Sequence, residues 1–253
     1  DAYINQLSHY AVHREFTLAR YSHEYLLDHP PWPTAWKHHS LFMAWTDYMY
    51  TGDKRSLRQN YEILKKKTLE HCARDDGLLN TKDQRDNVDW PQGERDNYDF
   101  REVNTVINAF YYKTLLQMTD IAKALGTKDE AENYAQKAIV VKKAFNNVFF
   151  DQEKGVYVDG DKSTHSSIHA NMIPLAFDLV PEERVQTVAD FVESKGMACS
   201  VYAAQYLLEG LYKSGKSDVA LKRITAKGLR SWHNMLRLGS TITFEAWDNQ
   251  FKP

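Results

Sequence analysis

The chain has 253 residues, a formal net charge of -2 at pH 7, 43% hydrophobic residues and 26% charged residues. Its length suits one large domain or two small ones and is enough to bury a substantial core. Charges of both signs are spread along the sequence, so no basic stripe is available to neutralise a phosphate backbone, and no apolar run approaches the ~20 residues that span a bilayer. We therefore expect neither a nucleic-acid partner nor a membrane partner.

The N-terminal half is predicted to be a series of helices. The segment from Tyr3 to Leu27 and the aromatic segment from Thr34 to Tyr50 both carry apolar residues at helical spacing. After a stop at Thr51-Gly52, Asp53 leads into a further helix with apolar positions between Leu57 and Thr68. The sequence opens with Asp1-Ala2-Tyr3, without a methionine or a signal-peptide pattern, and we expect a cut edge there.

The clearest helical pattern lies in the middle of the chain. Apolar positions from Val103 to Leu125 recur at intervals of three and four residues, and Gly126 then predicts a helix end. Thr127 and Glu130 form a capping-box pattern for the next helix, which extends to Val148. The only strand signal is Gly155–Val158, which predicts a small ribbon.

The C-terminal half continues the helical pattern. Pro181, followed by two glutamates, is expected to open one helix, and the stripe from Ala204 to Leu211 predicts another that ends at Gly215. Ser217 is the expected cap of the next helix. In total we expect about nine or ten helices joined by short connections, as in antiparallel helical pairs. Cys72 and Cys199 are too few for a disulfide scaffold and leave the compartment undecided.

These elements predict a single all-α domain over residues 1–253, because no linker divides the chain. An open solenoid of helical pairs and a closed α/α toroid both fit the pattern. The toroid is favoured for two reasons. No repeat of fixed period is detectable, and the connections on one side are tight turns whereas those on the other side are long polar excursions. These excursions are Asp75–Asp99, Asp151–Ser167 and Gly239–Pro253.

The first excursion contains a cluster of residues suited to a sugar site. Asp89 and Glu94 could hold hydroxyl groups or move protons, Trp90 offers a face for stacking on a sugar, and Arg95 lies beside them. The alternative interpretation is a solvated acidic loop. A calcium loop fits poorly, because the alternating ligands and central glycine of an EF-hand are missing.

The last excursion places Glu245 two residues before Trp247. A carboxylate next to an indole has its pKa raised by desolvation, which suits a group that accepts a proton near neutral pH. The alternative is a surface glutamate after a loop. His165 and His169 are spaced like the ligands of a zinc protease helix, but the catalytic glutamate of that motif is replaced by Ser166. We therefore expect no metal and no cofactor.

Five segments together resemble the catalytic domain of α-L-rhamnosidases, glycoside hydrolase family 78. In chain order they read WPTAWKHHSLFMAW…YTGD, VDWPQGERD, HSSIHANMIPLAF, GMACSVYAAQYLLEGLY and GSTITFEAWD. Each segment alone is modestly specific, but the ordered set is strongly so and extends over essentially the whole chain. The resemblance implies an (α/α)6 toroid of helical hairpins and an inverting hydrolysis of terminal α-L-rhamnosides in a rhamnose-containing glycan or glycoside.

The resemblance also assigns roles to residues. Glu245 in TITFEAWD matches the general base of the family, and Trp36 and Trp90 match tryptophans that line the sugar pocket. His169 falls in a characteristic motif whose role is not assigned. The full set expected to contact the substrate is Asp1, Trp36, Asp89, Trp90, Arg95, His169 and Trp247.

The general acid is the least certain assignment, because the family places it before the helix that corresponds to Trp36. Asp1-Ala2 resembles the tail of that acid motif, so the acid itself is expected to precede Asp1. Glu94 is the alternative, since DWPQGER is similar to the acid motif, although its place in the chain order argues against it. Family members continue with more helices and a β-sandwich, so we expect a chain trimmed at both ends, with further domains on the same polypeptide.

Two other functions remain open at this point. The first is an inverting toroid glycosidase that acts on another sugar, because a fold does not fix the substrate. The second is a non-catalytic carbohydrate-binding module built from the same helices.

In the favoured reaction, two carboxyl groups stand about 6.5–9.5 Å apart and leave room for the attacking water.

Overall fold

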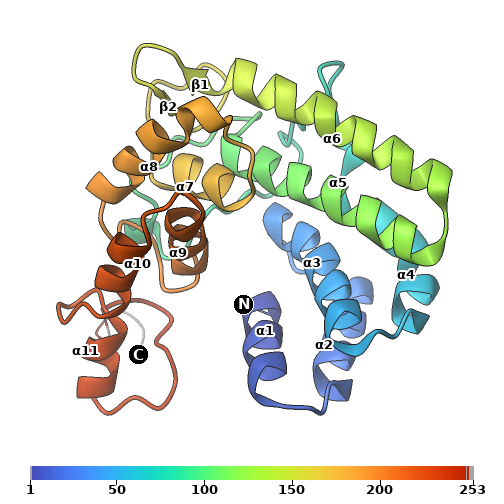
Figure 1. The fold of residues 1–253 in the computed structure, drawn as a ribbon, viewed down its shortest axis with the longest axis horizontal. Helices are drawn as coiled ribbons and strands as arrows, with labels where there is room; N and C mark the ends of the chain where they lie inside the picture. Colours follow the sequence, from blue (N-terminus) through green and yellow to red (C-terminus); the bar gives the residue numbers. More distant parts are fainter. Residues whose placement is uncertain (1, 249, 251–253) are drawn as a thin grey trace. The chain divides into compact units, whose positions relative to one another are not determined.

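The computed structural model describes residues 2–248 and 250, and the regular secondary structure of these residues is almost entirely helical (Figure 1). The α-helices of the described residues are α1 (Ala2–Val12), α2 (Thr17–Asp28), α3 (Thr34–Thr51), α4 (Arg55–Lys67), α5 (Thr105–Leu125), α6 (Lys128–Val148), α7 (His169–Ala176), α8 (Val185–Ser194), α9 (Ala204–Lys213), α10 (Ser217–Ile224) and α11 (Trp232–Arg237). Short 3-10 turns occur at Glu70–Cys72, Gln92–Glu94 and Glu182–Arg184. None of the helices in these ranges has the length and apolar character needed to cross a bilayer.

The predicted ribbon is confirmed. Strand β1 (Phe150–Asp151) pairs antiparallel with β2 (Val156–Tyr157), and Phe150 lies opposite Tyr157. Gly155, in the tight connection between them, has a φ of +70°, a backbone conformation that glycine adopts without strain.

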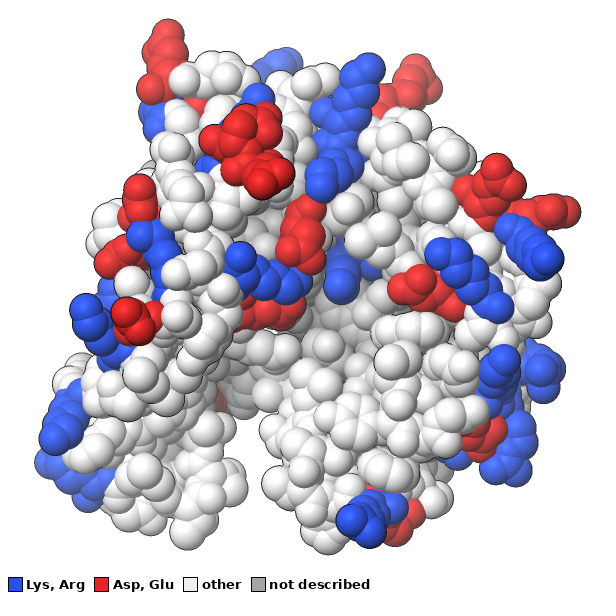
Figure 2. Space-filling view, viewed as in Figure 1, with Lys and Arg blue, Asp and Glu red and all other residues white. Residues whose placement is uncertain are grey.

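The described residues form two compact units. Unit 1 consists of Asp1–Asn87 and Phe110–Phe145, and unit 2 consists of Val88–Ala109 and Asn146–Pro253. Helix α5 therefore starts in unit 2, and its longer part belongs to unit 1. On the face shown in Figure 2, basic and acidic side chains alternate over both units. Within unit 2, for example, Lys216 Nζ lies 2.6 Å from Asp190 Oδ1.

Unit 1 is organised around α3. The consecutive residues from Leu41 to Ala44 are all buried, so this helix is covered on every side rather than along one stripe. Helices α1, α2 and α4 each pack against it. Gly52 ends α3 with a left-handed φ of +68°, as the sequence predicts.

Unit 2 is built on α7, whose residues from His169 to Ala176 are all buried. It packs against α8 and α9. Gly210 on α9 makes the second contact possible, because a Cβ atom at this position would lie 3.0 Å from the Met172 carbonyl oxygen and 3.1 Å from the Leu175 Cβ. The two helices therefore approach each other more closely than any larger residue would allow.

The structure differs from the predicted helices at three places. The segment from Tyr3 to Leu27 forms two helices, because the Glu15 carboxylate accepts a hydrogen bond from the Thr17 backbone N–H at 2.7 Å and so starts α2. The helix expected from Pro181 begins as a 3-10 turn and becomes α-helical only at Val185. Ser217 is the first residue of α10 and does not cap it with its side chain.

A buried carboxylate links three elements of unit 1. Asp47 on α3 is 2% exposed and accepts hydrogen bonds from the Tyr10 hydroxyl at 2.7 Å and the Arg20 Nε at 3.0 Å. Burial, together with the Asp47 hydrogen bond, raises the pKa of Tyr10. Arg20 extends the network to Asp53 at 3.3 Å. The carboxylate thereby connects α1, α2 and the start of α4.

Replacement of Asp47 by asparagine is expected to destabilise unit 1. The amide keeps the shape of the carboxylate but loses its charge and presents an NH2 group to the donors of Tyr10 or Arg20. We expect the free energy of unfolding to fall by about 2–4 kcal/mol, measured by urea titration. The matched control is Glu132→Gln on the exposed face of α6. Equal stability of the two variants would contradict the assigned network.

Two buried histidines in unit 1 make stability depend on pH. His23 and His38 each use Nε2 to donate to a backbone carbonyl, of Ser40 at 3.0 Å and Thr68 at 3.2 Å. Among the described residues, neither Nδ1 has a hydrogen-bond partner. Desolvation by burial is the main cause that lowers the pKa of each to about 4.

The unfolded chain binds protons at these histidines below pH 6.5, whereas the folded chain does so only near pH 4. The free energy of unfolding is therefore expected to decrease as the pH falls from about 6.5 to about 4, by up to about 1.4 kcal/mol per pH unit for each group. A His38→Gln variant should show a shallower slope over this window in urea titrations. The exposed His13→Gln serves as the control, and an unchanged slope for His38→Gln would contradict the prediction.

Candidate active site

Segments from four of the sequence motifs meet in unit 2 around one loop. This loop, Gly196–Ser200, connects α8 to α9, and we call it the junction loop. The Ser200 N–H donates to Asp89 Oδ2 at 2.8 Å, and the Cys199 carbonyl accepts from Trp247 Nε1 at 2.7 Å. His169 Nε2 reaches the same Asp89 oxygen at 2.7 Å. Residues far apart in the sequence are thus held by backbone groups of a single short segment.

Asp89 is fully engaged by protein groups. Its side chain is buried, Oδ2 accepts from His169 and Ser200, and Oδ1 accepts from the Trp90 N–H at 2.8 Å. Since an ionised carboxylate only accepts, His169 Nε2 carries the proton of this bond. His169 is the first residue of α7 and is completely buried. The pair therefore ties the loop that carries Trp90 to the start of α7.

Trp90 itself points outward, with 43% of its surface exposed. The peptide group between Asp89 and Trp90 is held at both of its polar atoms. Its N–H donates to the Asp89 carboxylate, and its carbonyl, that of Asp89, accepts from Arg95 Nε at 2.7 Å. The Arg95 guanidinium also lies over the Phe100 ring, 5.5 Å from its centroid. An exposed indole on a fixed backbone is a suitable surface for stacking on a sugar ring.

Glu94 belongs to the same loop and is buried. Both of its carboxylate oxygens accept hydrogen bonds from Arg230, which reaches Oε1 at 3.1 Å and also contacts Oε2. The same guanidinium donates to the Met197 carbonyl at 2.8 Å and to the Cys199 carbonyl at 3.0 Å. Glu94 is therefore part of an ion pair that reaches the junction loop.

A polar hollow of about 390 Å³ opens beside this ion pair. It is lined by Gln92, Gly93, Asp96, Asn97, Lys195, Met197, Ala198 and Arg230. Asp96 and Asn97 both have left-handed backbones, with φ of 47° and 55°, and Asp96 pairs with Lys195 at 3.0 Å. Asn and Asp tolerate this conformation better than other non-glycine residues, which explains their presence at this turn.

Glu245 is half-buried, and Trp247, two residues later, belongs to an aromatic pair. Trp247 is 1% exposed, and its ring meets the Trp232 ring edge-on, with 5.1 Å between centroids. Burial raises the pKa of Tyr202, and the negative charge of Glu245 adds to this effect, which places the carboxylate near that phenol. Glu245 is thus a partly desolvated carboxylate on a segment anchored by its neighbour Trp247.

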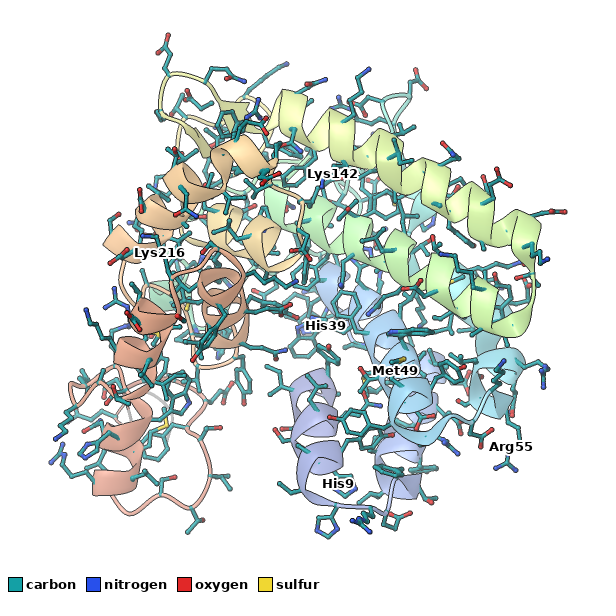
Figure 3. The ribbon with its side chains drawn as sticks, in the orientation of Figure 1. His9, His39, Met49, Arg55, Lys142 and Lys216 are labelled. Atoms are coloured by element: carbon teal, nitrogen blue, oxygen red, sulfur yellow. The ribbon has the colours of Figure 1, made fainter. Side chains whose placement is uncertain are left out.

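The remaining candidates belong to unit 1 or fall outside the described residues. Trp36 lies near the start of α3 and lines a pocket of about 80 Å³ with Tyr3 and His39. His39, labelled in Figure 3, lies in an aromatic cluster with its ring centroid 5.2 Å from that of Phe110. Asp1 is outside the described residues. Among the described residues, no group of three or more His, Cys, Asp or Glu side chains is arranged to hold a metal ion.

Sequence reasoning missed Arg230 and Tyr202 as parts of this site. Arg230 stands in a segment without a motif, and nothing in its neighbourhood distinguishes it from other surface arginines. Tyr202 lies within the segment GMACSVYAAQ, so its signal was present but unspecific. Both acquire a role only through contacts with residues distant in the sequence.

The Asp89 network predicts a large effect of a conservative substitution. In Asp89→Asn, either orientation of the amide directs its NH2 group at a donor, the Trp90 N–H on one side or the Ser200 N–H on the other. We expect the free energy of unfolding to decrease by about 2–3 kcal/mol in urea titrations. Asp218→Asn, on the exposed surface of α10, is the control. A loss no larger than that of the control would show that Asp89 does not hold the loop.

Comparisons with known proteins identify the family. The model of the bacterial α-L-rhamnosidase six-hairpin glycosidase domain matches residues 25–253. The chain is 24% identical over 231 residues to an α-L-rhamnosidase of Alteromonas sp. (strain LOR), covering 85% of this chain and 24% of that protein. An α-L-rhamnosidase of Formosa agariphila is 27% identical over 225 residues, with 81% and 22% coverage. The chain therefore spans about a quarter of the length of these relatives.

Solved structures give the same fold. The α-L-rhamnosidase of Dictyoglumus thermophilum aligns with a TM-score of 0.69 and 26% identity, over 87% of this chain and 25% of that one. A Klebsiella oxytoca rhamnosidase with rhamnose bound aligns with a TM-score of 0.73 and 14% identity, over 87% of this chain and 42% of that one. The fold class predicted from the sequence is confirmed. Because the family model covers nearly the whole chain, this chain belongs to the bacterial α-L-rhamnosidase six-hairpin glycosidase domain family.

Proposed function

We propose that this chain forms the catalytic domain, or a large part of it, of an inverting glycoside hydrolase that removes terminal α-L-rhamnose. Family membership supports the reaction class, and the relatives are named α-L-rhamnosidases. The family match runs through both compact units, which supports treating residues 1–253 as one domain. The observation that carries the proposal is the half-buried Glu245, anchored through Trp247 in the unit that also presents the exposed Trp90.

In this proposal Glu245 is the general base. Ionised, it takes a proton from a water molecule while the water oxygen forms a bond to the anomeric carbon, on the face opposite the departing oxygen. The glycosidic C–O bond breaks, and a second carboxyl group gives its proton to the leaving group. A positioned base typically contributes ~10²–10⁴-fold to the rate.

Glu94 fits the role of general acid poorly. A proton donor needs one carboxyl oxygen to carry the proton and face the leaving group, but both oxygens of Glu94 face the Arg230 guanidinium. We therefore propose that Glu94 has a structural role at the site. We propose that the general acid is a carboxyl group other than Glu94 and that Asp1 holds the substrate.

Trp90 is proposed to receive the sugar, because it has the exposed face needed for stacking. Trp36 lines a pocket within unit 1 and stays a predicted substrate residue. Asp89, His169 and Trp247 were expected to contact the substrate, but their side chains are buried against protein groups. We propose that these three residues, together with Arg95, position the groups that touch the sugar.

The central test is Glu245→Gln in the intact protein. We expect the kcat for an aryl α-L-rhamnoside to fall at least ~10²-fold, because the amide cannot accept the proton, while L-rhamnose binding by calorimetry stays within a few-fold. Glu153→Gln, at an exposed position in the connection between β1 and β2, is the matched control. Proton NMR of the unaltered enzyme should show β-L-rhamnose as the first product.

Each alternative has its own outcome in this experiment. Near-normal turnover by Glu245→Gln would remove Glu245 from the role of base. Hydrolysis of a different aryl glycoside in preference to the rhamnoside would indicate a glycosidase for another sugar. Binding of rhamnose without hydrolysis by the unaltered protein would identify a carbohydrate-binding module.

A further inference from the structure

Arg230 lies in the connection between α10 and α11 and joins two loops of unit 2. Its guanidinium contacts both carboxylate oxygens of Glu94 and donates to two carbonyls of the junction loop, those of Met197 and Cys199. Only the planar, forked guanidinium of arginine presents enough donors in fixed directions to satisfy all of these acceptors together. A lysine at the same place would keep the charge and lose the fork.

The Cys199 carbonyl connects Arg230 to the segment of the proposed base. Its oxygen accepts from Arg230 Nη2 at 3.0 Å and from Trp247 Nε1 at 2.7 Å. A carbonyl oxygen has two lone pairs, so these two donors use its full capacity. The position of the carbonyl fixes the Trp247 indole, and Trp247 is two residues from Glu245.

A second route runs through the backbone into α11. Ser231, next to Arg230, caps this helix by accepting from the Asn234 N–H at 3.1 Å. Trp232 then packs on Trp247, and Met235 Sδ accepts from the Phe244 N–H at 3.5 Å. Phe244 and Trp247, which flank Glu245, therefore both contact α11, and this helix begins beside Arg230.

We propose that Arg230 is a positioning residue for Glu245, which it holds through the Cys199 carbonyl and through α11. This inference rests on the proposed function of Glu245 as the base. Because a displaced base lowers the rate of the chemical step more than it weakens substrate binding, the effect of Arg230 falls on kcat. A direct contact between Arg230 and the sugar would instead raise KM.

The first test compares Arg230→Lys with Arg223→Lys in the intact protein. Arg223 lies in the same unit and donates to the Glu193 carbonyl at 2.9 Å, without a hydrogen bond to the junction loop in the part of the chain that the structure describes. For an aryl α-L-rhamnoside we expect Arg230→Lys to reduce kcat by about 10–100-fold with KM within ~3-fold, and Arg223→Lys to leave both unchanged. An unchanged kcat, or a rise in KM alone, would overturn the proposal.

The second test asks whether Arg230 acts through Glu245. In a Glu245→Ala variant, azide can replace the water nucleophile, because the anion attacks the anomeric carbon without giving up a proton to a base. Azide-supported turnover of the aryl rhamnoside by this variant should then be the same with and without the additional Arg230→Lys substitution. A further loss of about 10-fold in the double variant would show that Arg230 acts elsewhere.

Trp247→Phe provides independent evidence if Arg230→Lys folds poorly. It removes the indole donor to the Cys199 carbonyl, and we expect a similar loss of kcat and an effect that does not add to that of Arg230→Lys. Normal kcat in Trp247→Phe would contradict the route through the carbonyl. Failure of the proposed function is separately visible, because the unaltered protein would then lack rhamnosidase activity or Glu245→Gln would retain it.

Discussion

The Cys199 carbonyl, with its neighbours in the junction loop, is the constraint on which the arrangement of the candidate site in unit 2 depends. One oxygen receives both the Arg230 guanidinium and the Trp247 indole, and the next residue gives its N–H to Asp89. A buried backbone group that lost such a partner would incur a desolvation cost of ~1–3 kcal/mol, so these contacts hold each other in place. The loop thereby determines where the segments of Trp90 and Glu245 lie within the unit.

The residues that hold the site and those that can meet a substrate are different sets. Asp89, Glu94 and Trp247 are buried and use their polar side-chain atoms on protein partners, and His169 is buried with its Nε2 on Asp89, whereas Trp90 is exposed and Glu245 half-buried. In the proposed reaction, a base whose segment is held by buried neighbours would need little reorganisation when charge develops.

The helices were largely predictable because their information is local. Apolar spacing located α3, α5 and α6, and Gly52 and Gly126 marked helix ends since only glycine takes a left-handed backbone without strain. The break between α1 and α2 was missed because it occurs where a single hydrogen bond contributes. The break before α2 depends on the Glu15 carboxylate reaching the Thr17 N–H, and no periodicity signals such a contact. Helix boundaries depend on such local hydrogen bonds more than on the spacing of apolar residues.

The sequence by itself determined the all-α class, the family resemblance and the chemical types present: carboxylates and tryptophans in long polar loops. It could not separate an exposed Trp90 from a buried Trp247, because both occur in similar motifs and exposure depends on what packs against each ring. Only the tertiary structure decided that Glu94 is occupied by Arg230 and that the Cys199 carbonyl is shared. Those contacts join residues more than 30 positions apart, so their energies belong to the packed chain and leave no local pattern.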